Sequence, residues 1–320
     1  MKLKVIFFTL IISGLLLCGC GSQLADAYDL SAADINNLTD MNEDGFKANG
    51  FASALCVSDS DTPINADGVN AAAYGLFDLE TGEVVSQSGM FEKVYPASTT
   101  KVLTCLIALE SGDLDSEVVV PEESDITVSG SSMADLKPGD RIAMRDLLYG
   151  LMVPSGNDAA VAIACHISGS VSDFADLMNE RAHKIGATNS HFVNPHGLPD
   201  EDHYTTAYDM YLILNEAMKN PEFAQFASVS EYTASVTGAD GTVRSVTWTN
   251  GNGFLAGNFS LPDGVSMTAG KTGHTNAAGF CLVLAEETQG GKDMISVVFN
   301  APTYEDLYNG MRTLITKGLI

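Results

Sequence analysis

The chain has 320 residues, 45% of them hydrophobic, and a formal net charge of −25 at pH 7. This length and apolar content suffice for one large domain or two small ones. The strong negative charge excludes binding of nucleic acid, or of anionic lipid headgroups, through charge.

The first residues have the layout of a secretory signal, because two lysines precede an apolar run over positions 5–17. That run is short for a helix that crosses a membrane. The letters LCGC at 17–20 resemble the bacterial lipobox, in which cleavage precedes the last cysteine and its thiol is acylated. We therefore expect a lipoprotein signal peptide over residues 1–19 and lipidation of Cys20, in preference to an ordinary signal peptide or an uncleaved anchor.

Residues 20–50 are rich in Asp, Asn, Ser and Ala, a composition typical of a tether without a packed core. Within them, DMNEDG at 40–45 matches the first half of a calcium loop, but Phe51 stands where the loop needs a bidentate glutamate. We expect an acidic linker over 20–50, with a calcium site as the alternative, and a folded domain over 51–320.

A buried helix is predicted early in the domain. Pro96 should hold the approach extended, and Ser98 is expected to open the helix. Apolar residues cover most of its circumference as far as Leu109, so it should be buried, and Gly112 is expected to end it.

Further helices are predicted from apolar residues at helical spacing. Pro154 should end the first of them, so that the next three residues form a turn, and Thr206 with Asp209 is typical of a helix start. The segments expected to be helical are 144–152, 158–167, 174–185, one beginning near 206, and 306–317.

Apolar and alternating runs predict strands at both ends of the domain. They cover 71–77, 84–88, 232–236, 243–248, 266–272, 279–285 and 294–299. Two strands precede the helices and three consecutive strands follow them. We therefore expect one α/β domain whose sheet is assembled from both ends of the chain.

Four cysteines, Cys56, Cys105, Cys165 and Cys281, follow the lipobox. Three of them lie in apolar helical or strand segments, which favours buried free thiols over disulfides. The sequence has no C-x-x-C pair and no H-E-x-x-H run, so neither a metal site nor a cofactor is expected.

Ser98 and Lys101 are one helical turn apart and share a face of the buried helix. Burial disfavours the charged form of a lysine, and a neutral amine can take the proton of a neighbouring serine and make it a nucleophile. The alternative is a helix-capping serine beside an exposed lysine, and S-x-x-K alone would favour it.

Two further motifs favour the nucleophile over the capping serine. They are Ser155-Gly156-Asn157 and Lys271-Thr272-Gly273. S-x-x-K, S-D-N and K-T-G together are the signature of penicillin-binding proteins and class A β-lactamases. With LKPG at 136–139 and NPHGL at 194–198, the chain resembles the serine-type D-Ala-D-Ala carboxypeptidases, the low-molecular-mass penicillin-binding proteins. The resemblance implies the β-lactamase/penicillin-binding-protein-like fold, with a mainly antiparallel five-stranded sheet beside a helical region.

The resemblance also implies a catalytic role for each motif residue. Ser98 is expected to be the nucleophile, Lys101 its base, and Ser155 a proton relay to the leaving group. Asn157 is expected to bind the amide carbonyl of the substrate. His196 is expected to be structural.

The third motif is expected to bind substrate. Lys271 would line the pocket and help to keep the base neutral, and Thr272 would bind the substrate carboxylate. Gly273 would let the substrate lie along the strand, and the backbone N–H of His274 would join that of Ser98 in the oxyanion hole. Relatives often carry an arginine after the last strand, but this stretch reads PTYEDL, and Arg312 is the nearest candidate.

These features predict an enzyme that removes the terminal D-alanine from peptidoglycan stem peptides, inhibited by β-lactams and held outside the cytoplasm by its lipid. A β-lactamase is one alternative, although no E-x-x-L-N element follows the second motif. A catalytically poor penicillin-binding sensor is the other.

Overall fold

The computed structural model describes residues 55–58, 62–65 and 67–319. The predicted signal peptide at 1–19 and linker at 20–50 lie outside these residues. In the part of the chain that is described, no helix is both long and apolar enough to cross a membrane, and no group of three or more potential metal-ligating side chains occurs.

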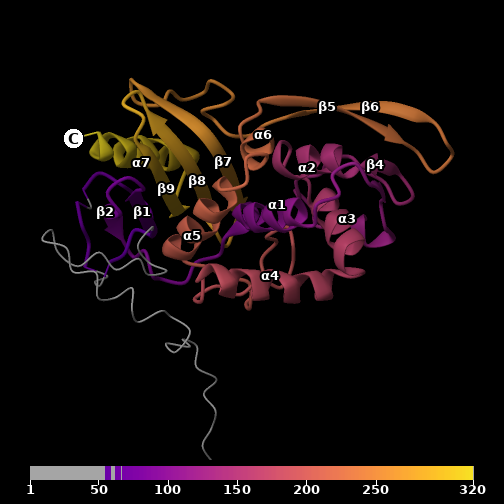
Figure 1. Ribbon diagram of the computed structural model, residues 1–320, viewed down its shortest axis with the longest axis horizontal. Coiled ribbons are helices and arrows are strands. Elements are labelled where there is room, and N and C mark those ends of the chain that lie inside the picture. The colour runs from indigo at the N-terminus through magenta and orange to yellow at the C-terminus, as the bar shows by residue number, and fades with distance from the viewer. Residues whose placement is uncertain (1–54, 59–61, 66, 320) are drawn as a thin grey trace, which may run out of the picture. The chain divides into compact units, whose positions relative to one another are not determined.

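The main sheet has five antiparallel strands in the order β2-β1-β9-β8-β7, which confirms a sheet built from both ends of the domain. β9 is its central strand, flanked by β1 and β8, and every residue of β1 is buried. β7 is an edge strand, and its free edge faces the helical region (Figure 1). The strands are β1 (Ala73–Asp78), β2 (Glu83–Ser88), β7 (Val265–Thr275), β8 (Gly279–Thr288) and β9 (Asp293–Ala301).

One face of this sheet packs against helix α7 (Tyr304–Gly318), and the other packs against the helical region. The α7 face buries Leu307, Tyr308, Met311 and Leu314 against apolar residues of the strands. Thr303 caps the helix, because its hydroxyl accepts a hydrogen bond of 3.0 Å from the backbone N–H of Asp306.

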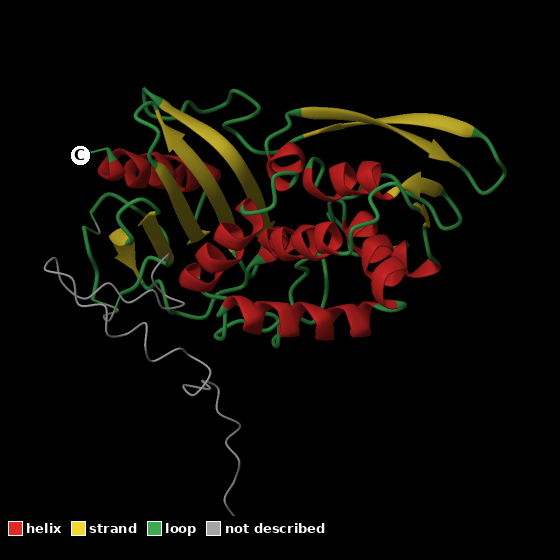
Figure 2. Ribbon diagram, in the orientation of Figure 1, coloured by secondary structure: helices red, strands yellow, loops and turns green. Residues whose placement is uncertain are grey.

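The helical region surrounds α1, whose residues 101–109 are all buried (Figure 2). The predicted capping at Thr206 is confirmed by a 3.0 Å bond from the Asp209 N–H. The predicted stop at Gly112 agrees with a helix end at Glu110 and a left-handed φ of 82° at the glycine. The helices are η3 (Ala97–Thr100), α1 (Lys101–Glu110), η4 (Glu122–Ser124), α2 (Met144–Met152), α3 (Asn157–Ser168), α4 (Val171–Ile185), α5 (Ala207–Met218) and α6 (Phe223–Ala227).

A second sheet, which the sequence did not predict, lies over α2. Its order is β3-β4-β5-β6, with β3 (Glu117–Val119), β4 (Arg141–Ala143), β5 (Glu231–Thr237) and β6 (Val243–Thr249). β5 and β6 form a long hairpin that reaches past the helices (Figure 1). β5 and β6 match the strands predicted at 232–236 and 243–248, whereas the short helix α6, which buries Phe223 and Phe226 ahead of them, was not predicted.

The four cysteines of the described residues are free thiols, as predicted. Cys105 and Cys281 are buried, as expected from their apolar segments, and so is Cys56, but Cys165 is only half-buried.

Candidate active site

The proposed nucleophile lies in a tighter turn than the sequence predicted. Ser98 belongs to the 3-10 helix η3, and α1 begins only at Lys101. Pro96 is not extended, with φ −74° and ψ −22°. The hydroxyl groups of Thr99 and Thr100 bond back to the carbonyls of Pro96 and Ala97, over 2.7 and 2.8 Å, and so hold the turn closed.

Ala97, the residue before the serine, has a φ of 48° in the left-handed region. For a residue with a Cβ this conformation costs on the order of 1–3 kcal/mol, and it persists only when the surroundings impose it. Such strain is often found at catalytic sites, and it sets the direction in which Ser98 leaves the turn.

Lys101 is completely buried and has three contacts around Nζ. They are Ser98 Oγ at 3.0 Å, Asn157 Oδ1 at 2.7 Å and the backbone oxygen of His196 at 2.8 Å. The last two can only accept hydrogen bonds. A neutral amine donates its two hydrogens to them, which leaves its lone pair directed at the Ser98 hydroxyl.

The electrostatic surroundings favour this neutral form. Burial lowers the pKa of Lys101 well below its ordinary value, and the positive charge of Lys271 lowers it further, as predicted. The carboxylate of Asp158 opposes this shift only in part. Lys101 is therefore suited to accept a proton from Ser98.

The second motif forms the turn between α2 and α3. Ser155 has a left-handed φ of 62°. Asn157 begins α3 and is buried, and its backbone N–H donates to Ser132 O over 2.9 Å. Because its Oδ1 faces Lys101, the group that Asn157 can offer a substrate is the Nδ2 amide, a donor that suits a carbonyl oxygen.

Lys271 extends from the edge strand β7 toward the second motif. Its Nζ lies 2.9 Å from Ser155 Oγ and 3.0 Å from Thr272 O. Burial lowers the pKa of Lys271 to about 7. A cationic Lys271 beside a neutral Lys101 is the charge distribution that these two pKa shifts favour.

Gly273 also has a structural reason that the sequence did not predict. A Cβ on this residue would lie 2.9 Å from Ser98 N and 3.0 Å from both Pro96 O and Ala97 Cβ. The absence of a side chain at Gly273 therefore lets the turn that carries Ser98 pack directly against strand β7. Its neighbour His274 points to the opposite face, where its ring stacks on Phe280 with centroids 4.2 Å apart.

An open cleft meets Ser98 from two sides. One lobe has a volume of about 270 Å³, and its lining includes Ser155, Thr272 and Tyr304. The other has about 410 Å³ and is lined mainly by residues 128–132, 197–199 and 275–277. Ser98 and His274 line both lobes, and neither lining includes an aspartate or a glutamate.

His196 contributes through its backbone, which the sequence analysis missed. Its carbonyl is one of the three contacts of Lys101, while its ring accepts a bond of 3.1 Å from Leu198 N. Burial lowers the pKa of this ring to about 3. A backbone oxygen carries no sequence signal, so only the surrounding NPHGL motif could have pointed to it.

Arg312 does not line either lobe of the cleft. It lies on α7 beside a separate surface hollow with Asn309, Thr313, Thr316 and Lys317. No arginine is found among the residues that line the two lobes, where Tyr304 and Leu307 represent the start of α7 instead.

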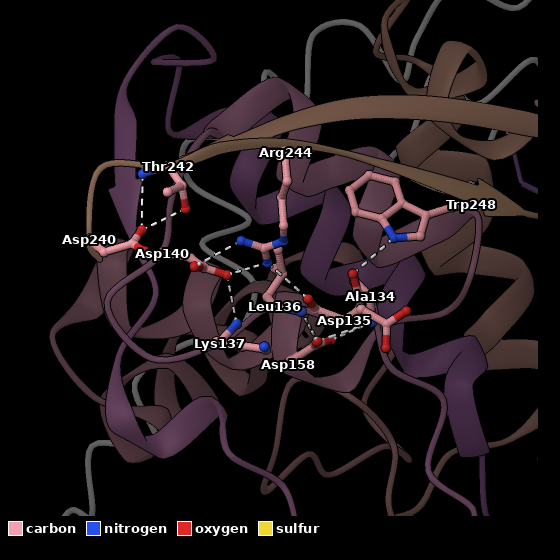
Figure 3. A network of polar contacts seen from close by, with 10 residues as sticks. All are labelled: Ala134, Asp135, Leu136, Lys137, Asp140, Asp158, Asp240, Thr242, Arg244 and Trp248. Carbon is pink, nitrogen blue, oxygen red and sulfur yellow. Dashed lines mark hydrogen bonds and ion pairs between the residues drawn. The ribbon is translucent and has the colours of Figure 1, made fainter. Parts of the chain in front are cut away.

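A polar network fastens the loop that borders both lobes (Figure 3). Asp158 accepts bonds from the N–H groups of Ala134 and Leu136 at 2.8 and 3.0 Å. From the hairpin, Trp248 Nε1 donates to Ala134 O over 2.9 Å, and Arg244 bonds both carboxylate oxygens of Asp140. The hairpin thus supports the rim of the cleft.

A model of the D-alanyl-D-alanine carboxypeptidase family, Peptidase S11, matches residues 60–303. The chain belongs to this family. The structure has the fold of β-lactamases and penicillin-binding proteins, as the sequence motifs predicted.

Individual family members agree with this assignment. The chain is 34% identical over 235 residues to the D-alanyl-D-alanine carboxypeptidase DacF of Bacillus subtilis. This match covers 71% of the chain and 57% of DacF. The chain is 35% identical over 264 residues to DacC of Escherichia coli, at 80% and 62% coverage. The solved Streptomyces K15 DD-transpeptidase superposes with a TM-score of 0.73 at 29% identity, covering 80% of this chain and 99% of that one. The chain spans about three fifths of the length of the first curated relatives it matches.

Proposed function

We propose that this family member is a serine-type D-Ala-D-Ala carboxypeptidase that removes the terminal D-alanine from peptidoglycan stem peptides. The observation that carries the proposal is the 3.0 Å contact between Ser98 Oγ and the buried Lys101 Nζ, whose other two partners are acceptors. This arrangement activates a serine without histidine or metal.

In the first half of the reaction Ser98 Oγ attacks the carbonyl carbon of the penultimate D-alanine, and Lys101 takes the hydroxyl proton. The backbone N–H groups of Ser98 and His274 would stabilise the negative oxygen that forms. As the peptide bond breaks, the leaving amine needs a proton. Ser155, which lies 2.9 Å from Lys271 Nζ, would deliver it.

Substrate recognition would use neutral donors and one cation. The Asn157 amide would donate to the carbonyl of the acyl side. Lys271 and Thr272 would bind the terminal carboxylate, without the arginine that relatives often carry there.

Water then has to release the acyl group. A class A β-lactamase uses a glutamate for this step, but no carboxylate lines either lobe here. Lys101 is the remaining base. A penicillin keeps its opened ring attached and continues to obstruct the water, whereas a peptide has lost D-alanine. We therefore expect rapid peptide turnover and a persistent penicillin adduct.

One experiment separates the three functions. The purified protein is incubated with a D-Ala-D-Ala peptide and separately with penicillin, and D-alanine release and adduct lifetime are followed. A carboxypeptidase releases D-alanine and keeps the penicilloyl group for many turnovers. Fast loss of that group would instead indicate a β-lactamase, and an adduct without D-alanine release would indicate a sensor.

We also propose that the protein acts outside the cytoplasm, anchored to the bacterial cell membrane by a lipid on Cys20, with residues 20–50 as linker to the domain at 51–320. The LCGC run and the apolar segment before it support this. Labelling of cells with a radioactive fatty acid should mark the wild-type protein and not Cys20→Ser. Equal labelling of both would contradict it.

A further inference from the structure

The peptide group between Ala97 and Ser98 is closely approached by other segments of the chain at both of its edges. In a trans peptide the C=O and N–H groups point in opposite directions. The ideal Cβ position of Gly197 lies only 1.8 Å from Ala97 O, and that of Gly273 lies 2.9 Å from Ser98 N. The oxygen thus faces the loop that contains NPHGL, and the nitrogen faces strand β7.

A chain of three hydrogen bonds ends on this oxygen. The backbone N–H of Val193 donates to Nδ1 of His203 over 3.1 Å. The proton of the neutral ring must then be on Nε2, which donates to Thr100 Oγ1 over 2.9 Å. The Thr100 hydroxyl in turn donates to Ala97 O over 2.8 Å.

Each member of this chain is fixed by its surroundings. Thr100 and His203 are buried, and the His203 ring packs edge-on against Phe192. Burial lowers the pKa of His203 to about 4, so the ring stays neutral and keeps one tautomer at neutral pH. Neither residue lines the cleft.

We propose that Thr100 and His203 are positioning residues that aim the Ser98 N–H into the oxyanion hole. The two ends of one rigid peptide plane cannot turn independently. By fixing Ala97 O, the His203–Thr100 pair fixes the Ser98 N–H at the opposite edge of the same plane, directly after Ala97 with its left-handed φ of 48°. This inference rests on the proposed function, because it requires Ser98 to be acylated.

The test compares two buried threonines of the same turn and helix. Thr100→Val removes the hydroxyl that bonds Ala97 O. Thr104→Val is the matched control, because its equally buried hydroxyl bonds Pro195 O over 2.7 Å and has no contact with the oxyanion peptide. Thr100→Ser keeps the hydroxyl and should restore the wild-type behaviour.

Two quantities are measured: the rate of acylation by penicillin, and the infrared carbonyl stretch of the accumulated ester. Losing an oxyanion donor costs ~10²–10³ in rate, so we expect Thr100→Val to acylate about 10- to 100-fold more slowly. Its ester carbonyl should move to higher wavenumber, because its hydrogen bond is weaker. Thr104→Val should be acylated at a rate within about twofold of the wild type, and its ester carbonyl stretch should not shift.

His203→Asn is a second variant for the case in which Thr100→Val does not fold. Asn Oδ1 can still accept the Val193 N–H bond, but no donor reaches Thr100, so the carbonyl should again shift upward. If either folded variant has an unshifted carbonyl and a normal acylation rate, the positioning role is overturned. An equal loss of acylation rate in Thr104→Val overturns it as well. A wild-type protein that forms no acyl-enzyme overturns the proposed function itself.

Discussion

Lys271 Nζ lies 2.9 Å from Ser155 Oγ, and the two residues come from an edge strand and from a helix-to-helix turn that are 116 positions apart in the sequence. The contact joins the sheet to the helical region at the cleft. It also places a buried cation, with a pKa near 7, where a substrate carboxylate would bind.

The first prediction concerns pH. Lys271 is cationic below its pKa of about 7 and loses its charge above it, so KM for a peptide with a free C-terminal carboxylate should rise above pH 7. The same peptide with a C-terminal amide lacks the anion, and its KM should stay flat. Activity profiles of both substrates measure this. An equal rise in KM for the amide peptide would show that Lys271 does not bind the substrate carboxylate.

Gly273→Ala tests the contact between the strand and the nucleophile turn. The added Cβ would press on the backbone atoms Pro96 O and Ser98 N and on Ala97 Cβ, so acylation should slow by about 10- to 100-fold in a folded protein. Gly270→Ala on the same strand is the control, because its Cβ meets only side chains. The measurement is the rate of penicillin acylation in both variants and in the wild type. An equal effect of both substitutions would argue for general damage to the strand.

Arg244→Met should destabilise the protein by about 1–2 kcal/mol, because it leaves the carboxylate of Asp140 buried without its partner. Burial raises the pKa of Asp140, but the bonds from Arg244 and from the backbone N–H of Lys137, together with the charges of both residues, hold that pKa below its usual range. The contribution should therefore be present above about pH 4 and be lost as the pH falls through the lowered pKa. Chemical denaturation at several pH values measures both effects.

The control is Arg141→Met on the neighbouring strand β4. Its pair with Glu117 is 3.5 Å long and more than half exposed on both sides, so its loss should cost less than ~0.5 kcal/mol. Equal losses for the two arginines would contradict the structural role assigned to Asp140.

Glu286 is a buried acid on the α7 face of the sheet, bonded through one oxygen to Ser296. Burial raises its pKa well above the ordinary value. The folded state therefore keeps a proton that the unfolded state releases, and stability should fall by up to about 1.4 kcal/mol per pH unit above the unfolded pKa. Glu286→Gln should remove this slope and be the more stable protein at alkaline pH. Denaturation curves with the same slope for both would refute the assignment.

The main sheet and the three motifs could be predicted from sequence because their signals are local. Apolar strands flank a block of helical patterns, and each motif is a short run of neighbouring residues. Strands β3 and β4 were missed because each has only three residues and exists through pairing with distant partners.

The finer geometry of the site also depends on distant contacts. The left-handed Ala97 was not predicted, because the close approach of Gly197 to its carbonyl comes from a loop 100 residues later, beside the bond from Thr100 in its own turn. The packing of the nucleophile turn against Gly273 was not predicted for the same reason, since that turn lies more than 170 residues earlier. The carbonyl of His196 could not be chosen from sequence, because every residue has one.

The central claim is that Lys101 activates Ser98. The most direct test is the rate and the site of penicillin acylation in wild type and in Lys101→Ala, followed by intact mass and peptide mapping, with folding checked by thermal denaturation. The wild type should carry the adduct on Ser98. The folded Lys101→Ala protein should acylate about 10²–10⁴-fold more slowly. Acylation of the variant at the wild-type rate, or a wild-type adduct on Ser155, would contradict the account.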